Sequence, residues 1–355
     1  MSKTVVVGMS GGVDSAVAAL ILKEQGYDVI GLFMVNWKED SEDGACTAEE
    51  DYADVRQVAN KIGIPYYTVD FSKEYWDGVF ALFVEEYKRG RTPNPDVLCN
   101  REIKFGAFRE QAKKIGADFI ATGHYCGIEK KDGRTYLTRA VDENKDQTYF
   151  LNQVTETQIK DTLFPLEKLT KPEVRAIAER HGLINAKKKD STGICFIGER
   201  NFRQFLSRYL PMKKGEIRTL DGQVVGEHNG VFFYTVGQHR GFGLGGVKGA
   251  DNEKAWYVIR RDIENNVLYV NQGETDELFS DRLTTEGFNF ITEKIPDGME
   301  ITARIRHRQP LQKARFYYRE GGAEIVFEDK QRAVAPGQYC VIYDGNVCLG
   351  GGVIR

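Results

Sequence analysis

The sequence predicts an α/β protein with a doubly wound parallel sheet, followed by a small central domain and a C-terminal all-β barrel. Up to about residue 186, runs of β-branched apolar residues alternate with segments whose apolar residues recur at helical spacing. After about residue 205, glycines become frequent and short alternating runs replace the helical pattern. We therefore expect domains at residues 1–205, 206–280 and 281–355.

The elements follow from these patterns in chain order. The strands expected in the first domain are Thr4–Gly8, Asp28–Val35, Ile64–Asp70 and Asp118–Thr122. The helices expected between them are Ser15–Gln25, Ala48–Ile62, Lys73–Lys88 and Lys104–Ile115. Two further helices, Lys171–His181 and Phe202–Tyr209, flank the segment Asp190–Ile197. The later strands are expected at Trp256–Arg260, Val267–Val270, Glu300–Arg308 and Ala314–Tyr318.

Composition indicates a globular protein of the cytoplasm. Of 355 residues, 41% are hydrophobic and 28% charged, which excludes a disordered or fibrous chain. No run approaches the ~20 apolar residues of a membrane span, and the first residues lead directly into a strand without a signal-peptide pattern. Because the net charge is −3, any binding to nucleic acid must use a local basic surface.

The spacing of the cysteines indicates a catalytic role rather than a structural one. No two of them form a close C-x-x-C pair, so neither a structural metal nor an iron–sulfur cluster is expected. In a reducing compartment they should be free thiols. The six are Cys46, Cys99, Cys126, Cys195, Cys340 and Cys348.

A glycine-rich loop joins the first strand to the first helix. Its residues are Gly8, Met9, Ser10, Gly11, Gly12, Val13, Asp14 and Ser15. Backbone N–H groups of such a loop, together with the positive end of the helix dipole, can hold a pyrophosphate. No lysine follows as in the loops that cleave a γ-phosphate, and a glycine turn that only packs strand against helix is the alternative.

The string from Ser10 to Ser15 resembles the signature loop of the N-type ATP pyrophosphatases. Those enzymes split ATP between the α- and β-phosphates and transfer AMP to a substrate oxygen. The resemblance implies ATP as a substrate and magnesium accompanying it, with Asp14 as a metal ligand. It also implies that Met34 and Gly123 frame the adenine and ribose.

Two cysteines lie in unusual surroundings. Cys99 ends the motif Thr92-Pro93-Asn94-Pro95-Asp96-Val97-Leu98-Cys99 just before an expected helix, where a thiol pKa is lowered. Cys195 follows the basic run at 187–189, which also favours a thiolate. The alternative is that each is a small buried apolar residue.

With these motifs, Gly123-His124-Tyr125, the segment 145–151 and the segment 234–238 make the whole chain resemble the tRNA-specific 2-thiouridylases. The resemblance implies that Cys195 carries a persulfide, that Cys99 is the partner thiol and that Asp96 shuttles a proton. ATP would adenylate the C2 carbonyl oxygen of the wobble uridine, and sulfur would then displace AMP. Direct attack by the persulfide and prior release of hydrosulfide remain alternatives.

The same resemblance implies the RNA contacts. The tRNAs would be those for lysine, glutamate and glutamine, bound at the anticodon loop, with sulfur supplied by a cysteine desulfurase or a relay protein. The residues implied to contact tRNA are Asn94, Pro95, Asp96, His124, Lys145, Asp146, Gln147, Ile305, Arg306 and Gln338. Arg304 and Arg308 alternate with Arg306, so we expect all three on one face of a strand, ready for phosphates.

Two other functions remain open. Another ATP pyrophosphatase, which forms an amide or transfers nitrogen, would share the adenylation but not need the cysteines. A binding module for RNA or a sulfur carrier would bind ATP without releasing AMP.

Overall fold

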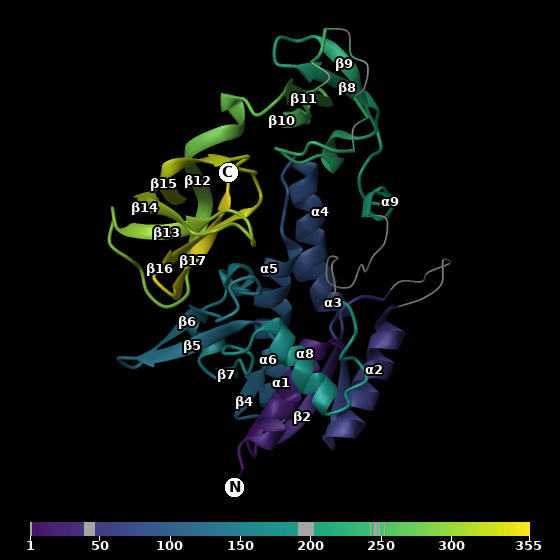
Figure 1. The fold of residues 1–355 in the computed structure, drawn as a ribbon, viewed down its shortest axis with the longest axis vertical. Coiled ribbons are helices and arrows are strands. Elements are labelled where there is room, and N and C mark those ends of the chain that lie inside the picture. Colours follow the sequence, from purple (N-terminus) through teal and green to yellow (C-terminus); the bar gives the residue numbers. More distant parts are fainter. Residues whose placement is uncertain are drawn as a thin grey trace.

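The computed structural model describes residues 2–38, 47–190 and 202–355, apart from positions 242, 245, 246, 248 and 252. Figure 1 shows the parallel-sheet unit at one end of the molecule, next to the N-terminus, with the barrel and the central unit beside each other at the other end. Within the described ranges, no helix is long and apolar enough to cross a membrane.

The first unit contains a five-stranded parallel sheet with the order β3-β2-β1-β4-β7. Its strands are β1 (Thr4–Met9), β2 (Asp28–Val35), β3 (Tyr66–Asp70), β4 (Phe119–Ala121) and β7 (Thr162–Leu163). The doubly wound prediction is confirmed, and all four predicted strands are present; the two-residue strand β7 was not predicted. Strand order reverses between β1 and β4, which is where such sheets bind ligands.

Two hydrophobic clusters cover the two faces of this sheet. Val5 and Val7 of β1 belong to one cluster and Val6 to the other, because successive strand side chains point to opposite faces. The first face is covered by α1 (Val13–Glu24), α2 (Thr47–Ile62) and α8 (Lys171–Arg180). The second is covered by α3 (Ser72–Tyr75), η1 (Trp76–Phe80), α4 (Ala81–Lys88), α5 (Pro95–Cys99), η2 (Asn100–Ala107) and α6 (Phe108–Lys114).

The helix predicted at Lys104–Ile115 begins much earlier. Asn94 is its N-cap, since its side chain accepts a hydrogen bond from the Asp96 amide at 3.2 Å, and Pro95 occupies the first turn. Elements α5, η2 and α6 then follow one another without a break to Lys114. Two prolines predicted a loop here, but an asparagine before a proline is also a helix start signal.

A hairpin leaves the first unit and joins the barrel. It consists of β5 (Cys126–Lys131) and β6 (Arg134–Arg139), and Leu137 and Thr138 pair with Cys348 and Val347. The chain then returns through η3 (Thr148–Leu151), α7 (Glu156–Ile159) and β7. The expected first domain therefore contributes two strands to the sheet of the last one.

The central unit is a four-stranded sheet with the order β10-β11-β8-β9. It follows the short helix α9 (Phe202–Leu206). Its elements are β8 (Gly215–Thr219), β9 (Val224–His228), η4 (Val231–Phe233), β10 (Trp256–Asp262) and β11 (Val267–Gln272). A small apolar cluster around Ile217, Val258 and Leu268 holds it together.

The barrel is a closed ring of strands in the order β12-β15-β14-β13-β16-β17, in which β17 also pairs with β12. After η5 (Asp276–Leu278), its strands are β12 (Phe279–Phe290), β13 (Glu300–Arg304), β14 (Gln312–Arg319), β15 (Gly322–Arg332), β16 (Tyr339–Asp344) and β17 (Val347–Ile354). Closure leaves no free sheet edge in the ring, and the predicted barrel is confirmed.

The strand predicted at Glu300–Arg308 ends at Arg304. The Gln309 side chain accepts a hydrogen bond from the Ile305 amide at 2.9 Å, which closes a turn. Arg306 and Arg308 lie in this turn, so the prediction that three arginines share one strand face is wrong.

Candidate active site

The glycine-rich loop is folded by its own serines. The Ser15 hydroxyl accepts a hydrogen bond from the Ser10 amide at 3.2 Å and donates to the Gly12 carbonyl at 3.1 Å. Gly11 has a φ of +76°, and a Cβ there would lie 2.8 Å from the Asp51 carbonyl oxygen. The loop is thus shaped before any ligand binds, and it ends at the N-terminus of α1.

Met34 and Gly123, which we expect to frame the nucleotide, border this loop. A Cβ built on Gly8 would lie 3.4 Å from the terminal methyl of Met34. A Cβ on Gly123 would lie 2.7 Å from both the Asp14 carbonyl carbon and the Ser15 nitrogen. Only glycine permits this approach of the chain after β4 to the start of α1.

Asp14 is held by two groups from distant parts of the chain. Lys171 donates to both carboxylate oxygens at 2.7 Å, and the Tyr125 hydroxyl donates to one of them at 2.8 Å. Burial, together with the negative charge of Asp14, raises the pKa of Tyr125 well above its ordinary value, so it stays a donor. A carboxylate already neutralised by an ammonium group does not fit the predicted role of magnesium ligand in this arrangement.

A second carboxylate, Asp190, gathers basic groups beside Asp14. Its oxygens lie 2.8 Å from Lys171 Nζ, 2.5 Å from Lys145 Nζ and 3.0 Å from a terminal nitrogen of Arg175. Burial alone would raise the pKa of Asp190, but the hydrogen bonds and charges of Lys145 and Lys171 lower it to about 2. Lys145, an expected tRNA contact, is thereby linked to the glycine-rich loop.

Gln147 reaches the same loop by another route. The side-chain oxygen of Gln147 accepts a hydrogen bond from the Tyr125 backbone amide at 2.9 Å, and the backbone amide of Gln147 donates to the Tyr125 carbonyl at 2.8 Å. Tyr125 in turn holds Asp14. The expected RNA-contacting segment and the expected nucleotide loop are therefore parts of one hydrogen-bonded network.

Asp146 points into the protein instead. It is 1% exposed and forms a buried ion pair with Arg304, and the Thr148 hydroxyl donates to its oxygens at 2.9 and 3.0 Å. Arg304 is 3% exposed and also donates to the Tyr343 hydroxyl. The prediction that Arg304 is available to phosphates is wrong, because this arginine neutralises a buried carboxylate.

His124 is also enclosed. Its Nδ1 lies 2.7 Å from the Thr122 hydroxyl, and its ring lies among those of Phe105 and Phe164. Burial and the nearby charge of Lys104 lower its pKa well below the ordinary value, so the ring is neutral.

Cys99 does not lie at a helix N-terminus. It is the last residue of α5, is 1% exposed and continues directly into η2. Burial raises its pKa to about 11, the charge of Lys104 opposing this and that of Asp96 adding to it. The predicted lowering of the thiol pKa is therefore wrong for this arrangement: the thiol is protonated at neutral pH.

Asp96 lies one helical turn before Cys99, so the two side chains share a face of the helix. One of its carboxylate oxygens is buried without a hydrogen-bond partner. Pro95 and Asn94, the other residues expected to contact the target base, form the first turn and the cap of the same helix.

The barrel supplies the remaining expected RNA contacts. Ile305 is 2% exposed, and its carbonyl accepts a hydrogen bond from Tyr149 at 3.3 Å. The exposed Arg306 donates to the Ala333 carbonyl at 2.8 Å. Gln338 donates through its side chain to the Thr92 carbonyl at 2.7 Å, at the start of the segment that carries Asn94 to Cys99.

Cys195, predicted to carry the persulfide, and Cys46 lie outside the described residues. The three other cysteines, which we expect to be non-catalytic, are buried in strands of the barrel sheet. Burial raises the thiol pKa at all three: Cys126, Cys340 and Cys348.

Sequence reasoning missed the groups that connect the site. Lys171, 8% exposed, was read only as the start of a helix, and Asp190 only as part of a segment between helices. No local sequence pattern could have identified Lys171 or Asp190 as site residues, because Asp14 and Lys171 are 157 positions apart. Tyr125 belongs to the motif Gly123-His124-Tyr125, which indicates no role for its side chain, although Tyr125 joins Asp14 to Gln147.

Known protein families and relatives match nearly the whole chain. Family models match residues 3–199, described as a tRNA methyl transferase HUP domain, 203–272, a tRNA methyl transferase PRC-barrel domain, and 280–354, an aminomethyltransferase beta-barrel domain. The tRNA-specific 2-thiouridylase MnmA of Listeria monocytogenes is 58% identical over 99% of this chain and 94% of its own length. The protein of that name from Streptococcus mutans is 56% identical over 99% of this chain and 95% of its own. The chain belongs to the family of tRNA-specific 2-thiouridylases.

Proposed function

We propose that this protein uses ATP to activate the C2 carbonyl oxygen of the wobble uridine in tRNA and replaces that oxygen with sulfur. The observation that carries the proposal is the network in which Asp14 of the glycine-rich loop is bonded through Tyr125 to Gln147 and through Lys171 and Asp190 to Lys145. It joins a loop suited to pyrophosphate to residues that the family resemblance implies to contact tRNA.

The first step, adenylation of the base, takes place at the glycine-rich loop. The uracil O2 attacks the α-phosphorus of ATP, pyrophosphate leaves, N3 loses its proton, and AMP is joined to the base through O2. The amides of the loop and the N-terminus of α1 hold the phosphates and stabilise the charge that develops on the leaving pyrophosphate. Adenylation turns a poor leaving oxygen into AMP. Asp14 could hold the magnesium that accompanies ATP only after Lys171 has moved away.

The second stage moves sulfur. The terminal sulfur of a persulfide on Cys195 attacks C2 and AMP leaves, which joins the base to Cys195 through two sulfurs. The Cys99 thiolate then attacks Sγ of Cys195, so that thiouridine is released and a Cys99–Cys195 disulfide remains. A dithiol must reduce this disulfide before the next turnover. If hydrosulfide is released first, the same two residues form the same disulfide.

Cys99 needs a proton acceptor, and Asp96 lies one helical turn before it. The buried Cys99 thiol is protonated at neutral pH and must lose its proton to act as a nucleophile. The unpartnered oxygen of Asp96, one turn away, is the acceptor that we propose for this proton. The sulfur atom itself would come from free cysteine, through a cysteine desulfurase acting directly or by way of a relay protein.

An assay with three proteins tests the function. Wild type, Cys99→Ser and Cys195→Ser are each incubated with tRNA, ATP, cysteine and a cysteine desulfurase, and nucleosides, AMP and pyrophosphate are quantified. We expect thiouridine from wild type only. Exchange of labelled pyrophosphate into ATP should persist in both variants with tRNA present, because the cysteines act after adenylation.

The other outcomes identify the competing functions. Thiolation by both variants would refute the cysteine roles. Release of AMP and pyrophosphate by all three proteins without any thiouridine would favour an amide-forming or nitrogen-transferring ligase. Binding of ATP and tRNA by wild type without any AMP or pyrophosphate would indicate a binding module.

A further inference from the structure

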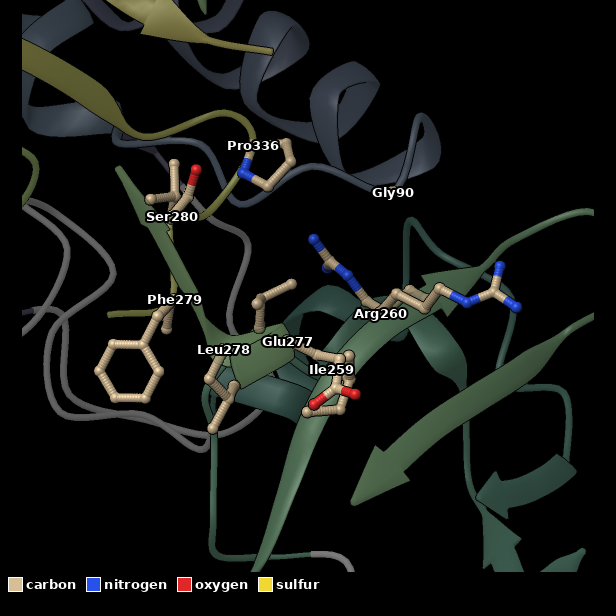
Figure 2. A pocket seen from close by; sticks show the side chains of 12 residues that line it. Gly90, Ile259, Arg260, Glu277, Leu278, Phe279, Ser280 and Pro336 are labelled. Atoms are coloured by element: carbon tan, nitrogen blue, oxygen red, sulfur yellow. The ribbon is translucent and has the colours of Figure 1, made fainter. Parts of the chain in front are cut away.

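A pocket lies where the three units of the molecule meet. Its volume is about 290 Å³. Figure 2 shows Gly90 after helix α4 and Pro336 of the barrel on one side, Ile259 and Arg260 of β10 on another, and Leu278 of η5 with Phe279 and Ser280 at the start of β12 on the third. The pocket lies outside the network around Asp14, and no residue of the glycine-rich loop lines it.

The pocket lining contains Arg261, an arginine without an ion-pair partner among the described residues, and also one acidic residue, Glu277, with which it forms no ion pair. One of the terminal nitrogens of Arg261, Nη1, is buried and has no hydrogen-bond partner. Its other terminal nitrogen donates to the Thr92 hydroxyl at 3.2 Å. Burial lowers the pKa of Arg261 to about 10, which leaves the group charged at neutral pH.

The neighbouring arginines each have a charged or aromatic partner. Arg332 pairs with Glu274 at 2.6 Å, Arg91 pairs with Glu86 at 3.2 Å, and Arg260 stacks over the ring of Tyr269. Across the described ranges, no carboxylate lies within ion-pair distance of Arg261. A buried charge without a partner is costly, so the exception points to an anion that comes from outside the chain.

The pocket adjoins the expected RNA surface of the barrel. Arg306 donates to the carbonyl of Ala333, a residue that lines the pocket. Pro336, also in the lining, accepts a hydrogen bond from the Thr92 amide at 2.7 Å, and Gln338 donates to the Thr92 carbonyl. Both expected RNA contacts thus border the pocket directly or through Thr92.

We propose that this pocket binds a phosphate group of the tRNA backbone, with Nη1 of Arg261 as the donor. The proposal rests on tRNA being the substrate. A phosphate would complete the ion pair that Arg261 lacks, while Nη2 keeps its hydrogen bond to Thr92. Because Thr92 begins the segment that leads to Asp96 and Cys99, the bound backbone would also fix the start of that segment.

The salt dependence of tRNA binding tests this. Arg261→Gln removes the charge but retains an amide donor for Thr92, and Arg261→Lys retains the charge. We expect Arg261→Gln to weaken tRNA binding about tenfold and to reduce the slope of log Kd against log salt by about one, as loss of one phosphate contact should. Arg261→Lys should keep the wild-type slope. Arg282→Gln, which removes an exposed arginine already paired with Asp281, is the matched control and should leave the slope unchanged.

A second measurement separates RNA phosphate from free phosphate. Inorganic phosphate is added at constant ionic strength during thermal unfolding of wild type and Arg261→Gln. If phosphate stabilises only wild type while both proteins show equal tRNA slopes, the pocket takes free phosphate and the RNA assignment is wrong. If neither phosphate nor tRNA distinguishes the two proteins, the pocket is not an anion site. Failure of wild type to bind tRNA at all would instead refute the proposed function.

Discussion

Burial sets the chemistry of the partner thiol. Near a helix N-terminus Cys99 would ionise readily, yet inside the run α5–η2–α6 its pKa rises to about 11. The position of a cysteine relative to helix ends can be estimated from sequence only if the helix start is identified correctly. Asn94 and Pro95 form the cap and the first turn of the helix instead of a loop, and burial of the thiol raises its pKa where the expected helix start would have lowered it.

The first prediction concerns the reactivity of Cys99. Because alkylation requires the thiolate, Cys99 should react with iodoacetamide about two orders of magnitude more slowly than glutathione at about pH 8. Its rate should still be rising at about pH 10, since the folded pKa lies near 11. Peptide mapping by mass spectrometry measures the rate at Cys99 itself. A rate equal to that of glutathione at neutral pH would contradict the raised pKa.

The second prediction concerns Gly123. In Gly123→Ala the new methyl group would lie 2.7 Å from backbone atoms of Asp14 and Ser15 and must displace the start of α1. We expect ATP binding to weaken by about tenfold or more, as measured by calorimetry. Gly78→Ala is the control, because its nearest neighbours would be side-chain atoms of Glu102 at 3.4 and 3.5 Å. Equal affinity in the two variants would show that Gly123 does not shape the loop.

At the scale of elements, the segment 145–148 is fixed by the barrel. Asp146 is buried against Arg304 at the end of β13, and Thr148 and Tyr343 complete the hydrogen bonds. Sequence patterns identified the segment as important but assigned all three of its polar residues to RNA. They could not separate Asp146 from its neighbours, because its partner is 158 positions away.

The third prediction tests that ion pair. Arg304→Ala leaves a buried carboxylate without its main partner and should lower the free energy of unfolding by about 3 kcal/mol. Arg315→Ala, which breaks an exposed pair with Glu300, should cost less than about 1 kcal/mol. Urea denaturation followed by circular dichroism compares the two. Similar losses would mean that the Asp146 pair contributes no more than a surface pair.

At the scale of the whole molecule, the barrel and the parallel sheet share a core. Val6 of β1 and Phe105 belong to the same apolar cluster as Val341 and Tyr343 of the barrel. The central sheet has its own small cluster around Ile217 and Val258. The sequence predicted the parallel sheet and the barrel from local periodicity. It could not predict this shared core, since contacts between units leave no periodic signal.

The fourth prediction follows from these cores. Hydrogen exchange at increasing urea should show β8 to β11 losing protection first, because their cluster is the smallest. Strands β1, β16 and β17 should lose protection together at higher urea. Mass spectrometry of peptic peptides resolves these segments. Earlier opening of β16 and β17 than of β1 would show that the shared cluster does not couple the two units.

The hairpin β5–β6 has a consequence for engineering. Since β6 pairs with β17, the barrel sheet is assembled from two separate stretches of chain. A chimera that replaced only residues after 280 with those of a relative would seat a foreign β17 against the resident β6. Exchange of the barrel between family members must therefore include residues 126–139. It requires two additional crossover sites, one on each side of that hairpin.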